Sequence, residues 1–450
     1  MDPARALLAR QPLKGRAIAL FFGLALVVAA ALRTVWIIDM EYKGDERFMF
    51  DRSQAIPAHE PWPELGMPSG QGLRNPAFSI WIFVWLARYF HANTPLLLDR
   101  SVIYCNVAAF VGLAVFAWTK RDAKQREAWL WAMAIGGASG ISVLLHRKIW
   151  AQSVLPIFCV AFLIGWSRRD TWIGAALWGL FGALLGQIHM SGFFFAFAFF
   201  LVDLTIGSLR FDRPKGHRTK WPTWIIGSCA GAYLLKPWIK YVLSGVDKGA
   251  PWSREEVMSG RFFRTWFSDT CGLGLDYSLG GNFPEFLKGP KIGHQDDVYL
   301  PMLLQGVGFT IGIFACVLLV RGVSKGVGAR VASGRSLVDR LLSIDDVEQA
   351  IVSSLLAYGV CITLSGIHVY RHYLLVTFPL EWLSLAWVIL KWSPRPRVVL
   401  GGMWLAQLGL SYCFLTYIHE HKGAPWGDYG QAYRVQNPAV EKVRGWSAMP

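Results

Sequence analysis

Long runs of apolar residues recur along the whole chain, separated by short polar connections. A helix that crosses about 30 Å of hydrocarbon needs roughly 20 predominantly apolar residues, and most of these runs approach that length. The pattern therefore predicts an all-α polytopic membrane protein with about 11–13 transmembrane helices. The predicted spans are 17–39, 75–92, 97–119, 128–145, 150–166, 172–188, 190–206, 223–243, 300–320, 348–366, 373–390 and 398–417.

Composition supports one integral membrane domain over residues 1–450. Hydrophobic residues make up 54% of the chain, and there are 22 Trp among 450 residues, which is unusual for a soluble domain. The longest stretch outside the predicted spans is 244–299, about the lower limit for an independent domain. Since no soluble catalytic domain is predicted, any chemistry must take place at or in the membrane.

The distribution of charge predicts the orientation of the chain. The formal net charge is +15, and the basic residues gather in short loops rather than on one folded face. This is the pattern of cytoplasmic loops in a membrane protein and argues against nucleic-acid binding. The basic segments are the N-terminus, 120–126, 168–169, 210–220, 321–340 and 391–397. The segments expected on the opposite, outer side are 40–74, 146–149, 188–191, 244–299, 367–372 and the C-terminal tail 418–450.

One count does not agree with this orientation. An outer loop 40–74 and an inner loop 120–126 require an odd number of crossings between them, yet two apolar runs, 75–92 and 97–119, lie there. Either 75–92 is a partial or juxtamembrane segment, or loop 120–126 is an exception to the charge rule. The sequence leaves both readings open.

The first predicted outer loop carries the strongest chemical signal. Asp45 and Glu46 are adjacent, Arg47 and Arg52 follow, and the loop is rich in acids. A carboxylate at the membrane face can take a proton from a hydroxyl group, and a nearby arginine can bind a phosphate. The segment after Asp45 has helical character, which predicts an amphipathic helix on the membrane surface. The alternative is a solvated loop whose acids cap a helix.

Three short loops on the predicted outer side bring cationic and aromatic side chains to the membrane surface. Interfacial snorkelling and structurally satisfied histidines are the alternatives to a binding role. Arg371 is the strongest phosphate candidate among these residues. The loops contribute Arg147, Lys148 and Gln152; His189; and His368, Tyr370, Arg371 and His372.

The seven cysteines are scattered, mostly inside apolar runs, and no C-x-x-C spacing occurs. This distribution supports neither a zinc site nor a disulfide framework. No dense group of acids and histidines demands a metal ion, so no metal ligands are assigned and no cofactor is predicted. A divalent cation is left open.

These residues resemble the motifs of GT-C-class membrane glycosyltransferases, most closely the bacterial family-39-like proteins related to protein O-mannosyltransferases and lipid A aminoarabinose transferases. The resemblance extends loosely over the whole chain, and the order of the motifs carries more weight than any one of them. A departure is Ala77, where the family has a second proline. The similar segments are Asp45-Glu46, Asn75-Pro76-Ala77 with Trp81, Arg147–Ser153, Arg371–Leu375 with Phe378-Pro379, and Gly427–Gly430.

The resemblance implies a GT-C fold with juxtamembrane helices in the first outer loop, 40–74, which would be the catalytic loop. It implies inverting transfer from a polyprenyl-phosphate-linked sugar to a glycan, lipid or protein acceptor, with Asp45 as general base and Glu46 as its partner. The expected location is the bacterial inner membrane, with the site facing the periplasm or exterior. The implied residues are Arg52, Arg147, Lys148, Arg371 and His372 for the donor phosphate, and His189, Gln152, His368 and Tyr370 for the substrate pocket.

Two further expectations complete the sequence reading. The loop 244–299 is long, punctuated by Gly and Pro, and rich in aromatic residues, which predicts a lid over the site. The main alternative function is a transporter or flippase of an anionic lipid such as a polyprenyl phosphate. That function would also explain basic loops and interfacial aromatic residues, although mid-span charges and inverted repeats are not evident.

Overall fold

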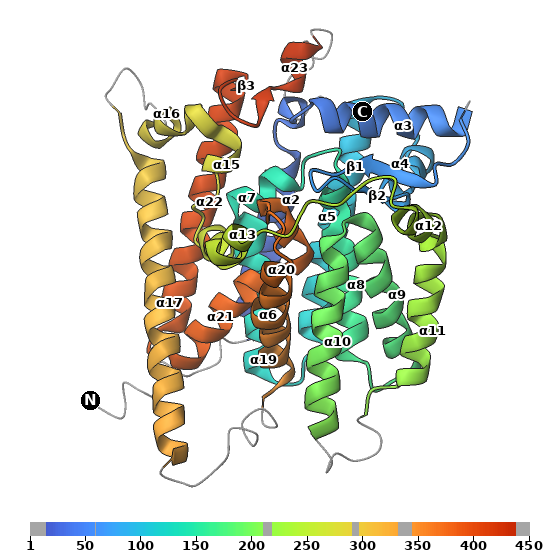
Figure 1. Ribbon diagram of the computed structural model, residues 1–450. Coiled ribbons are helices and arrows are strands. Elements are labelled where there is room, and N and C mark those ends of the chain that lie inside the picture. Colours follow the sequence, from blue (N-terminus) through green and yellow to red (C-terminus); the bar gives the residue numbers. More distant parts are fainter. Residues whose placement is uncertain (1–14, 59, 210–217, 290–296, 332–343, 438–450) are drawn as a thin grey trace.

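A computed structural model describes residues 15–58, 60–209, 218–289, 297–331 and 344–437, and this part of the chain is mostly helical (Figure 1). Among these residues, five helical segments are long and apolar enough to cross a membrane, and a pair bent by 66° is a sixth candidate. The chain is thus a helical membrane protein. The five are α2 (Gly15–Thr34), α5 (Pro95–Trp118), α17 (Leu300–Val331), the run α19 (Asp346–Ile351), η6 (Val352–Tyr358) and α20 (Gly359–Leu364), and α22 (Pro396–His421); the bent pair is η7 (Arg371–Thr377) and α21 (Leu380–Trp392).

Each predicted span falls on a helix, although several helices are shorter than expected. The predicted span 223–243 is divided because Pro237 lies at the start of a new helix, where its missing N–H costs nothing. The shorter helices are α4 (Phe78–Tyr89), α6 (Ala123–Ala138), α7 (Gly140–Leu145), η2 (Ala151–Val154), α8 (Leu155–Ser167), α9 (Trp172–Ile188), α10 (Ser191–Leu209), α11 (Trp221–Ala232), η4 (Tyr233–Leu235) and α12 (Lys236–Ser244).

The length of helix α4 bears on the crossing count between loops 40–74 and 120–126. It has 12 residues, which corresponds to about 18 Å at 1.5 Å per residue. This length is well short of the hydrocarbon thickness of about 30 Å. Of the described helices between these loops, α5 is the one long and apolar enough to cross a membrane. The short α4 therefore favours the interpretation of 75–92 as a juxtamembrane segment.

Glycines let α9 and α11 pack closely. A Cβ atom on Gly179 would lie 2.3 Å from the carbonyl oxygen of Trp224, and one on Gly227 would lie 2.0 Å from that of Ala176. Neither position can hold a side chain without moving the helices apart. The Gly-rich apolar runs therefore serve helix packing inside the bundle.

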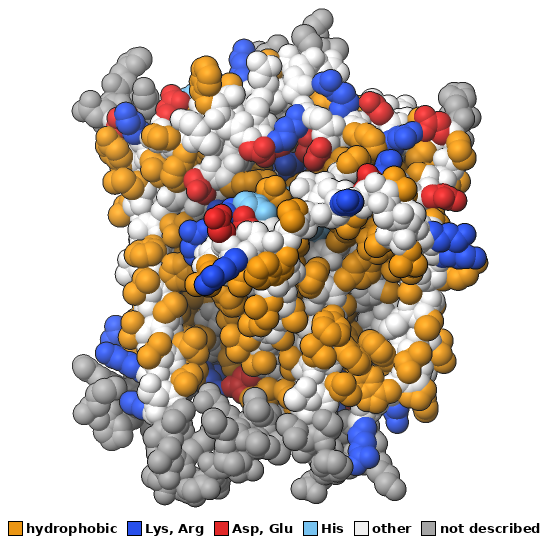
Figure 2. Space-filling view, in the orientation of Figure 1, with side chains coloured by type: hydrophobic (Ala, Val, Ile, Leu, Met, Phe, Trp, Pro, Cys, Tyr) orange, Lys and Arg blue, Asp and Glu red, His pale blue; other side chains and the backbone are white. Residues whose placement is uncertain are grey.

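The chemically interesting loops gather at one end of the bundle, the upper end in Figure 1. Acidic side chains are frequent there, whereas hydrophobic side chains cover the belt below (Figure 2). The elements outside the bundle are α3 (Gly44–Ala58), β1 (Leu65–Pro68), β2 (Arg74–Pro76), α13 (Arg254–Ser259), α14 (Arg261–Thr270), α15 (Asp276–Leu279), η5 (Gly280–Asn282), α16 (Phe283–Lys288), β3 (Gly423–Ala424), β4 (Gly430–Gln431) and α23 (Tyr433–Gln436). Strands β1 and β2 form one antiparallel pair, and β3 and β4 another.

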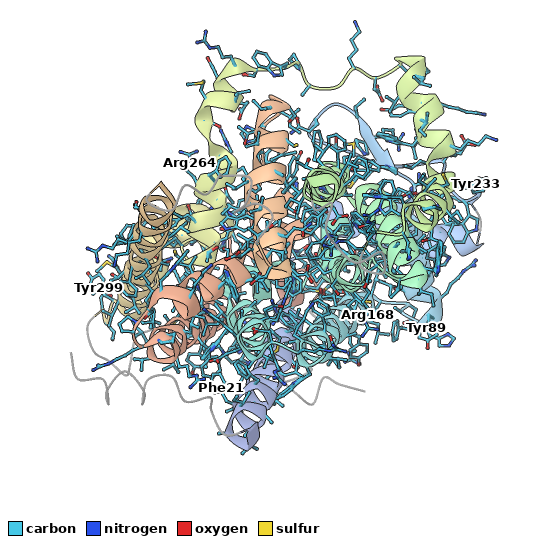
Figure 3. The ribbon with its side chains drawn as sticks, turned by 90° about the horizontal axis from the view of Figure 1, so that it is seen from below. Phe21, Tyr89, Arg168, Tyr233, Arg264 and Tyr299 are labelled. Carbon is cyan, nitrogen blue, oxygen red and sulfur yellow. The ribbon has the colours of Figure 1, made fainter. Side chains whose placement is uncertain are left out.

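The rim of the bundle is suited to a lipid environment. Viewed from below, Phe21, Tyr89, Tyr233 and Tyr299 lie toward the outside of the helices (Figure 3). Tyr89 and Tyr233 are 79% and 75% exposed, and large apolar side chains are exposed on many other helices as well. Such a surface is stable only against lipid or another apolar partner.

Candidate functional site

The start of α3 positions the acid pair. The carboxylate of Glu46 accepts a hydrogen bond from the backbone N–H of Lys43 at 3.1 Å, which is the reciprocal bond of a capping box. This bond turns Glu46 inward, where only 1% of its surface is exposed. Asp45, one residue earlier, stays half-buried. The helix thus presents one carboxylate to the interior and keeps the other near the surface.

Glu41, Glu46 and Lys148 form a buried cluster, here called the acid–lysine cluster. The Nζ of Lys148 donates to Glu41 at 2.7 Å and lies 3.5 Å from Glu46. Burial alone would lower the pKa of Lys148, but the charges of Glu41 and Glu46 outweigh it and raise that pKa. Burial raises the pKa of Glu46 to about 7, although Lys148 opposes the shift. The sequence reading assigned Lys148 to phosphate; in the structure its charge is already matched by carboxylates.

Asp45 is the accessible member of the acid pair. Within the described part of the chain, its carboxylate makes no hydrogen bond or ion pair. A general base must be able to reach the hydroxyl it deprotonates. Because Glu46 is enclosed and engaged whereas Asp45 is half-exposed and unengaged, the geometry favours Asp45 for this role and gives Glu46 a supporting one.

Arg147 lies inside the protein. Only 5% of its surface is exposed, and its guanidinium donates to the carbonyl oxygen of Trp36 at 2.8 Å. Asp99 of α5, which is fully buried, lies within range of the Arg147 charge. This placement links α5, the end of α2 and the loop after α7. Arg147 is therefore buried and engaged with the backbone, and it is not exposed to a phosphate in this structure.

Aromatic and histidine rings continue from the acid–lysine cluster to the loop 367–373. The Nζ of Lys148 lies 4.7 Å from the centre of the Trp150 ring, and the rings of Trp150 and His372 are 4.6 Å apart. His372 stacks on Tyr370 at 5.5 Å and lies 5.4 Å from His189. The structure therefore brings together Glu46, Lys148, His189, Tyr370 and His372, which come from four separate loops of the sequence.

Arg371 lies beside this run of rings and above a small pocket. It forms ion pairs with Asp269 of α14 and, at 3.5 Å, with Asp276 of α15. Burial raises the pKa of Asp269 to about 6, against the opposing charge of Arg371. The pocket has a volume of about 20 Å³, and its polar lining comprises Arg371, Asp269, Glu381, His146 and Ser142. Its apolar lining is Ile141, Leu145, Leu374, Leu375, Phe378 and Trp382. Arg371 is the cation of this lining, and two carboxylates share the pocket with it.

His368 belongs to a neighbouring polar group. Its Nδ1 lies 2.9 Å from Glu256 and its Nε2 lies 2.9 Å from a guanidinium N–H of Arg261. Since Arg261 can only donate, Nε2 accepts and Nδ1–H donates to Glu256. This network fastens α13 of loop 244–299 to the loop 367–373.

Arg52 stands apart from the other predicted site residues, whereas Gln152 is buried. Arg52 pairs with Glu60 on the outer surface, and in the described structure no hydrogen bond or ion pair connects it to the acid–lysine cluster. Gln152 is 5% exposed, and its side-chain oxygen has no hydrogen-bond partner among the described residues. Residues 290–296 of the predicted lid and 438–450 of the predicted tail lie outside the described residues.

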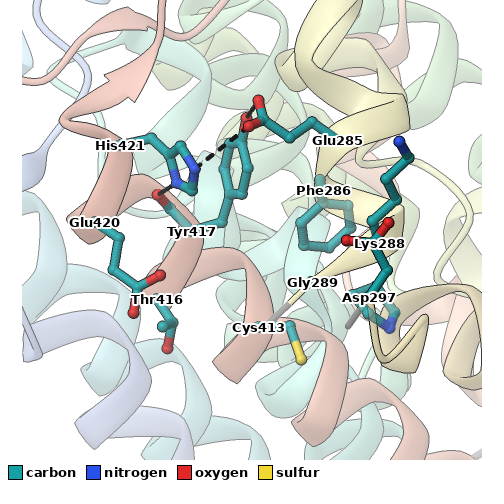
Figure 4. Close-up of a pocket in the computed structure, with 11 residues that line it drawn as sticks. Glu285, Phe286, Lys288, Gly289, Asp297, Cys413, Thr416, Tyr417, Glu420 and His421 are labelled. Atoms are coloured by element: carbon teal, nitrogen blue, oxygen red, sulfur yellow. Dashed lines mark hydrogen bonds and ion pairs between the residues drawn. The ribbon is translucent and has the colours of Figure 1, made fainter. Parts of the chain in front are cut away.

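A larger pocket of about 390 Å³ opens between α16, the start of α17 and the end of α22 (Figure 4). In it, Tyr417 donates to Glu285 at 2.9 Å, and His421 lies 3.7 Å from the same carboxylate. The Glu285 side chain is 60% exposed. The pocket contains none of the predicted site residues.

Several residues of the site were not predicted as such. Glu41 forms an ion pair with Lys148, and Asp269 forms one with Arg371. Asp99 lies within range of the Arg147 charge. Glu41 could have been suspected because it precedes the acid pair in the same loop. Asp269 and Asp99 carry no local signal, since their partners are about a hundred and about fifty positions away. Where side chains are described, no group of three or more His, Cys, Asp or Glu residues is arranged to hold a metal ion.

No protein-family model, curated protein or solved structure matches this chain.

Proposed function

We propose that the chain is a membrane glycosyltransferase that moves a sugar from a polyprenyl-phosphate donor to an acceptor hydroxyl at the outer face of the membrane. The observation that carries the proposal is the continuous run of contacts from helix α3 to the loop 367–373. Glu46 meets Lys148, Lys148 meets Trp150, and Trp150 meets His372, the neighbour of Arg371. Asp45, an unengaged carboxylate, is the neighbour of Glu46 at one end of this run, and Arg371, a cation paired with Asp269, is at the other.

The proposed reaction assigns one task to each end. Asp45 takes the proton from the acceptor hydroxyl while the oxygen of that hydroxyl attacks the anomeric carbon of the sugar. The bond between that carbon and the phosphate oxygen breaks, its electron pair leaves with the phosphate, and the configuration inverts. Arg371 stabilises the leaving phosphate, which needs little acid assistance once a cation faces it. Glu46 and Lys148 hold the start of α3 in place.

Arg371 must exchange partners for this role. Asp269 now occupies the guanidinium, so an incoming phosphate has to displace a carboxylate. The exchange is between two anions of similar geometry, both of which accept two parallel hydrogen bonds from arginine. Proton uptake by Asp269, whose pKa of about 6 is already raised by burial, would ease the exchange.

The decisive experiment is lipid analysis combined with turnover. The purified protein in nanodiscs should retain a polyprenyl-phosphate sugar detectable by mass spectrometry, and it should release polyprenyl phosphate when an acceptor is added. An inert protein that binds no such lipid would refute the proposal.

The flippase alternative rests on the same cationic residue, Arg371, as the binding group for a lipid phosphate. It predicts that the lipid crosses the bilayer chemically unchanged. Movement of intact donor between the leaflets of proteoliposomes, without sugar release at any acceptor concentration, would favour it over transfer.

A further inference from the structure

The described C-terminal segment contacts the start of the loop 40–74, which carries the acid pair. Residues 423–436, here called the clasp, comprise the β3–β4 hairpin and α23 at the same end of the molecule as α3 (Figure 1). The backbone N–H of Tyr433 donates to Met40 at 3.0 Å, and the Gln436 side chain donates to the carbonyl of Tyr42 at 2.7 Å. An isolated β-bridge joins Glu41 to Ala432. The clasp therefore fixes the backbone of residues 40–42 directly before the acid pair.

A buried carboxylate anchors this arrangement. Asp39 is 2% exposed; its Oδ2 lies 2.7 Å from Nδ1 of His419, and its Oδ1 lies 2.7 Å from Nε of Arg434. The Arg434 contact does not have the geometry of a hydrogen bond, so it is an ion pair. The ring of His419 also stacks on Trp36, with 4.5 Å between centres. The chain thus leaves α2 between the end of α22 and the clasp.

A chain of ion pairs extends from the clasp to the acid pair. Asp428 lies 2.8 Å from Nζ of Lys43, which lies 2.8 Å from Glu41. Glu41 in turn binds Lys148, and Lys148 lies 3.5 Å from Glu46. Charge therefore alternates at each step from the surface of the clasp to the buried carboxylate of α3.

The other edge of the clasp holds loop 244–299. The backbone N–H of Tyr429 donates to Ser278 at 2.9 Å, and that of Gly281 donates to Trp426 at 2.9 Å. Ser278 belongs to α15, whose Asp276 pairs with Arg371. One segment thus touches both the loop that carries Asp45 and the helix that faces Arg371.

We propose that the clasp sets the distance between Asp45 and Arg371, the two ends of the proposed site. Asp39 and Arg434 are the positioning residues of the clasp. Neither residue needs to touch a substrate. The catalytic part of this inference rests on the proposed transferase function, whereas the structural part does not. A misplacement of about 1 Å can cost about a hundredfold in rate, so a loosened clasp should lower kcat more than it changes donor KM.

The test compares Arg434→Gln and Arg434→Lys with the matched control Arg395→Gln, an exposed arginine at the other end of α22. Hydrogen exchange is followed at the amides of residues 40–46 in the full-length protein. We expect exchange there to become about tenfold faster or more in Arg434→Gln, with kcat about 10- to 100-fold lower and donor KM little changed. Arg434→Lys should keep much of the amide protection at residues 40–46 and much of the kcat. Arg395→Gln should behave as the wild type.

Asp428→Asn provides a second variant because Asp428 is 44% exposed and its change threatens the fold least. It should increase exchange at residues 40–46 in the same direction but to a smaller extent. Unchanged hydrogen exchange at residues 40–46 in both Arg434→Gln and Asp428→Asn, with both variants folded, would refute the proposal that the clasp fixes this segment. If the wild type transfers no sugar, the transferase proposal fails while the exchange data still decide the clasp. If exchange rises but kcat stays at the wild-type value, the positioning role of Arg434 is refuted.

Discussion

Asp45 and Glu46 are adjacent in sequence but differ in environment. Asp45 is half-exposed and unengaged in the described structure, whereas Glu46 is buried against Lys148. This difference assigns them different tasks, because a base needs access and an anchor needs partners. Asp45 and Glu46 should therefore respond differently to substitution.

Asp45→Asn should abolish transfer and leave folding and donor binding intact. The asparagine keeps the size of the side chain but cannot accept the proton, and losing a general base typically costs about 10²–10⁴-fold in rate. Turnover and donor affinity of the purified variant are the measurements. Asp51→Asn, an exposed acid on the same helix, is the matched control and should keep full activity. Normal turnover by Asp45→Asn would remove Asp45 from the mechanism.

Glu46 should make stability depend on pH. Its pKa is raised from 4.5 to about 7, so the folded state holds a proton that the unfolded state releases at lower pH. The resulting contribution is fully present below pH 4.5 and is lost as the pH rises through about 7. The shift corresponds to about 3 kcal/mol in order of magnitude. Glu46→Gln mimics the protonated acid, so its melting temperature should exceed that of the wild type at pH 8 and approach it at pH 5. A gap of equal size at both pH values would contradict this account.

Arg371 should act on the donor phosphate. Truncating a charge-assisted contact costs roughly 1.5–3 kcal/mol, so Arg371→Ala should weaken donor binding by about tenfold or more. Asp269→Asn should have the opposite tendency, because it releases the guanidinium for phosphate while keeping the shape of the side chain. Arg264→Ala, at an exposed position of α14, is the control. Isothermal titration with the donor checks all three, and tight binding by Arg371→Ala would exclude the phosphate role.

At the level of elements, loop 244–299 is tied to the site by two of its helices. Asp269 of α14 pairs with Arg371, and Glu256 of α13 pairs with His368. A phosphate that displaces Asp269 from Arg371 would break one of these ties. The described part of the predicted lid is therefore coupled to the residue proposed to bind the donor.

Donor binding should change hydrogen exchange in residues 254–282. Saturating donor competes with Asp269, so the amides of α14 and α15 should change protection while those of α9 stay constant. The experiment uses the full-length protein in nanodiscs with and without the polyprenyl-phosphate sugar. The same protection in both states would show that this loop does not respond to the donor.

How much of these elements the sequence could predict depends on how local their cause is. The apolar runs have a local signal in their composition and length, and the sequence predicts them as helices. The start of α3 also has a local signal, the acid Glu46 three residues after Lys43, and this segment too is predicted to be helical. The length of α4 and the break at Pro237 were less evident because apolar composition continues across them. The ion pairs of Lys148 and Arg371 depend on partners that lie far away in the sequence, and Glu41 and Asp269 therefore changed how those cations are understood.

At the level of the whole molecule, the orientation in the membrane is a prediction from charge. Helix α3, the clasp and the described part of loop 244–299 share one end of the bundle (Figure 1). Of the described helices between α3 and the basic loop 120–126, α5 is the one long and apolar enough to cross a membrane. An impermeant maleimide should therefore label Asp51→Cys in intact cells or spheroplasts but label Arg121→Cys only after lysis. The unmodified protein gives the background from its seven cysteines. Labelling of both sites from outside would disprove this topology.

The unequal lengths of the helices have a consequence for the bilayer. Helix α9 has 17 residues, or about 25 Å, whereas the 32 residues of α17 correspond to about 48 Å. Helix α9 exposes the apolar side chains of Trp172 and Ile173, so lipids beside it would thin to match its length, whereas those beside α17 need not. Hydrophobic mismatch would then make the membrane itself asymmetric around the protein, bringing headgroups on one flank closer to the bilayer centre. The surrounding acyl-chain length thereby becomes a variable that shapes how a long-chain lipid approaches.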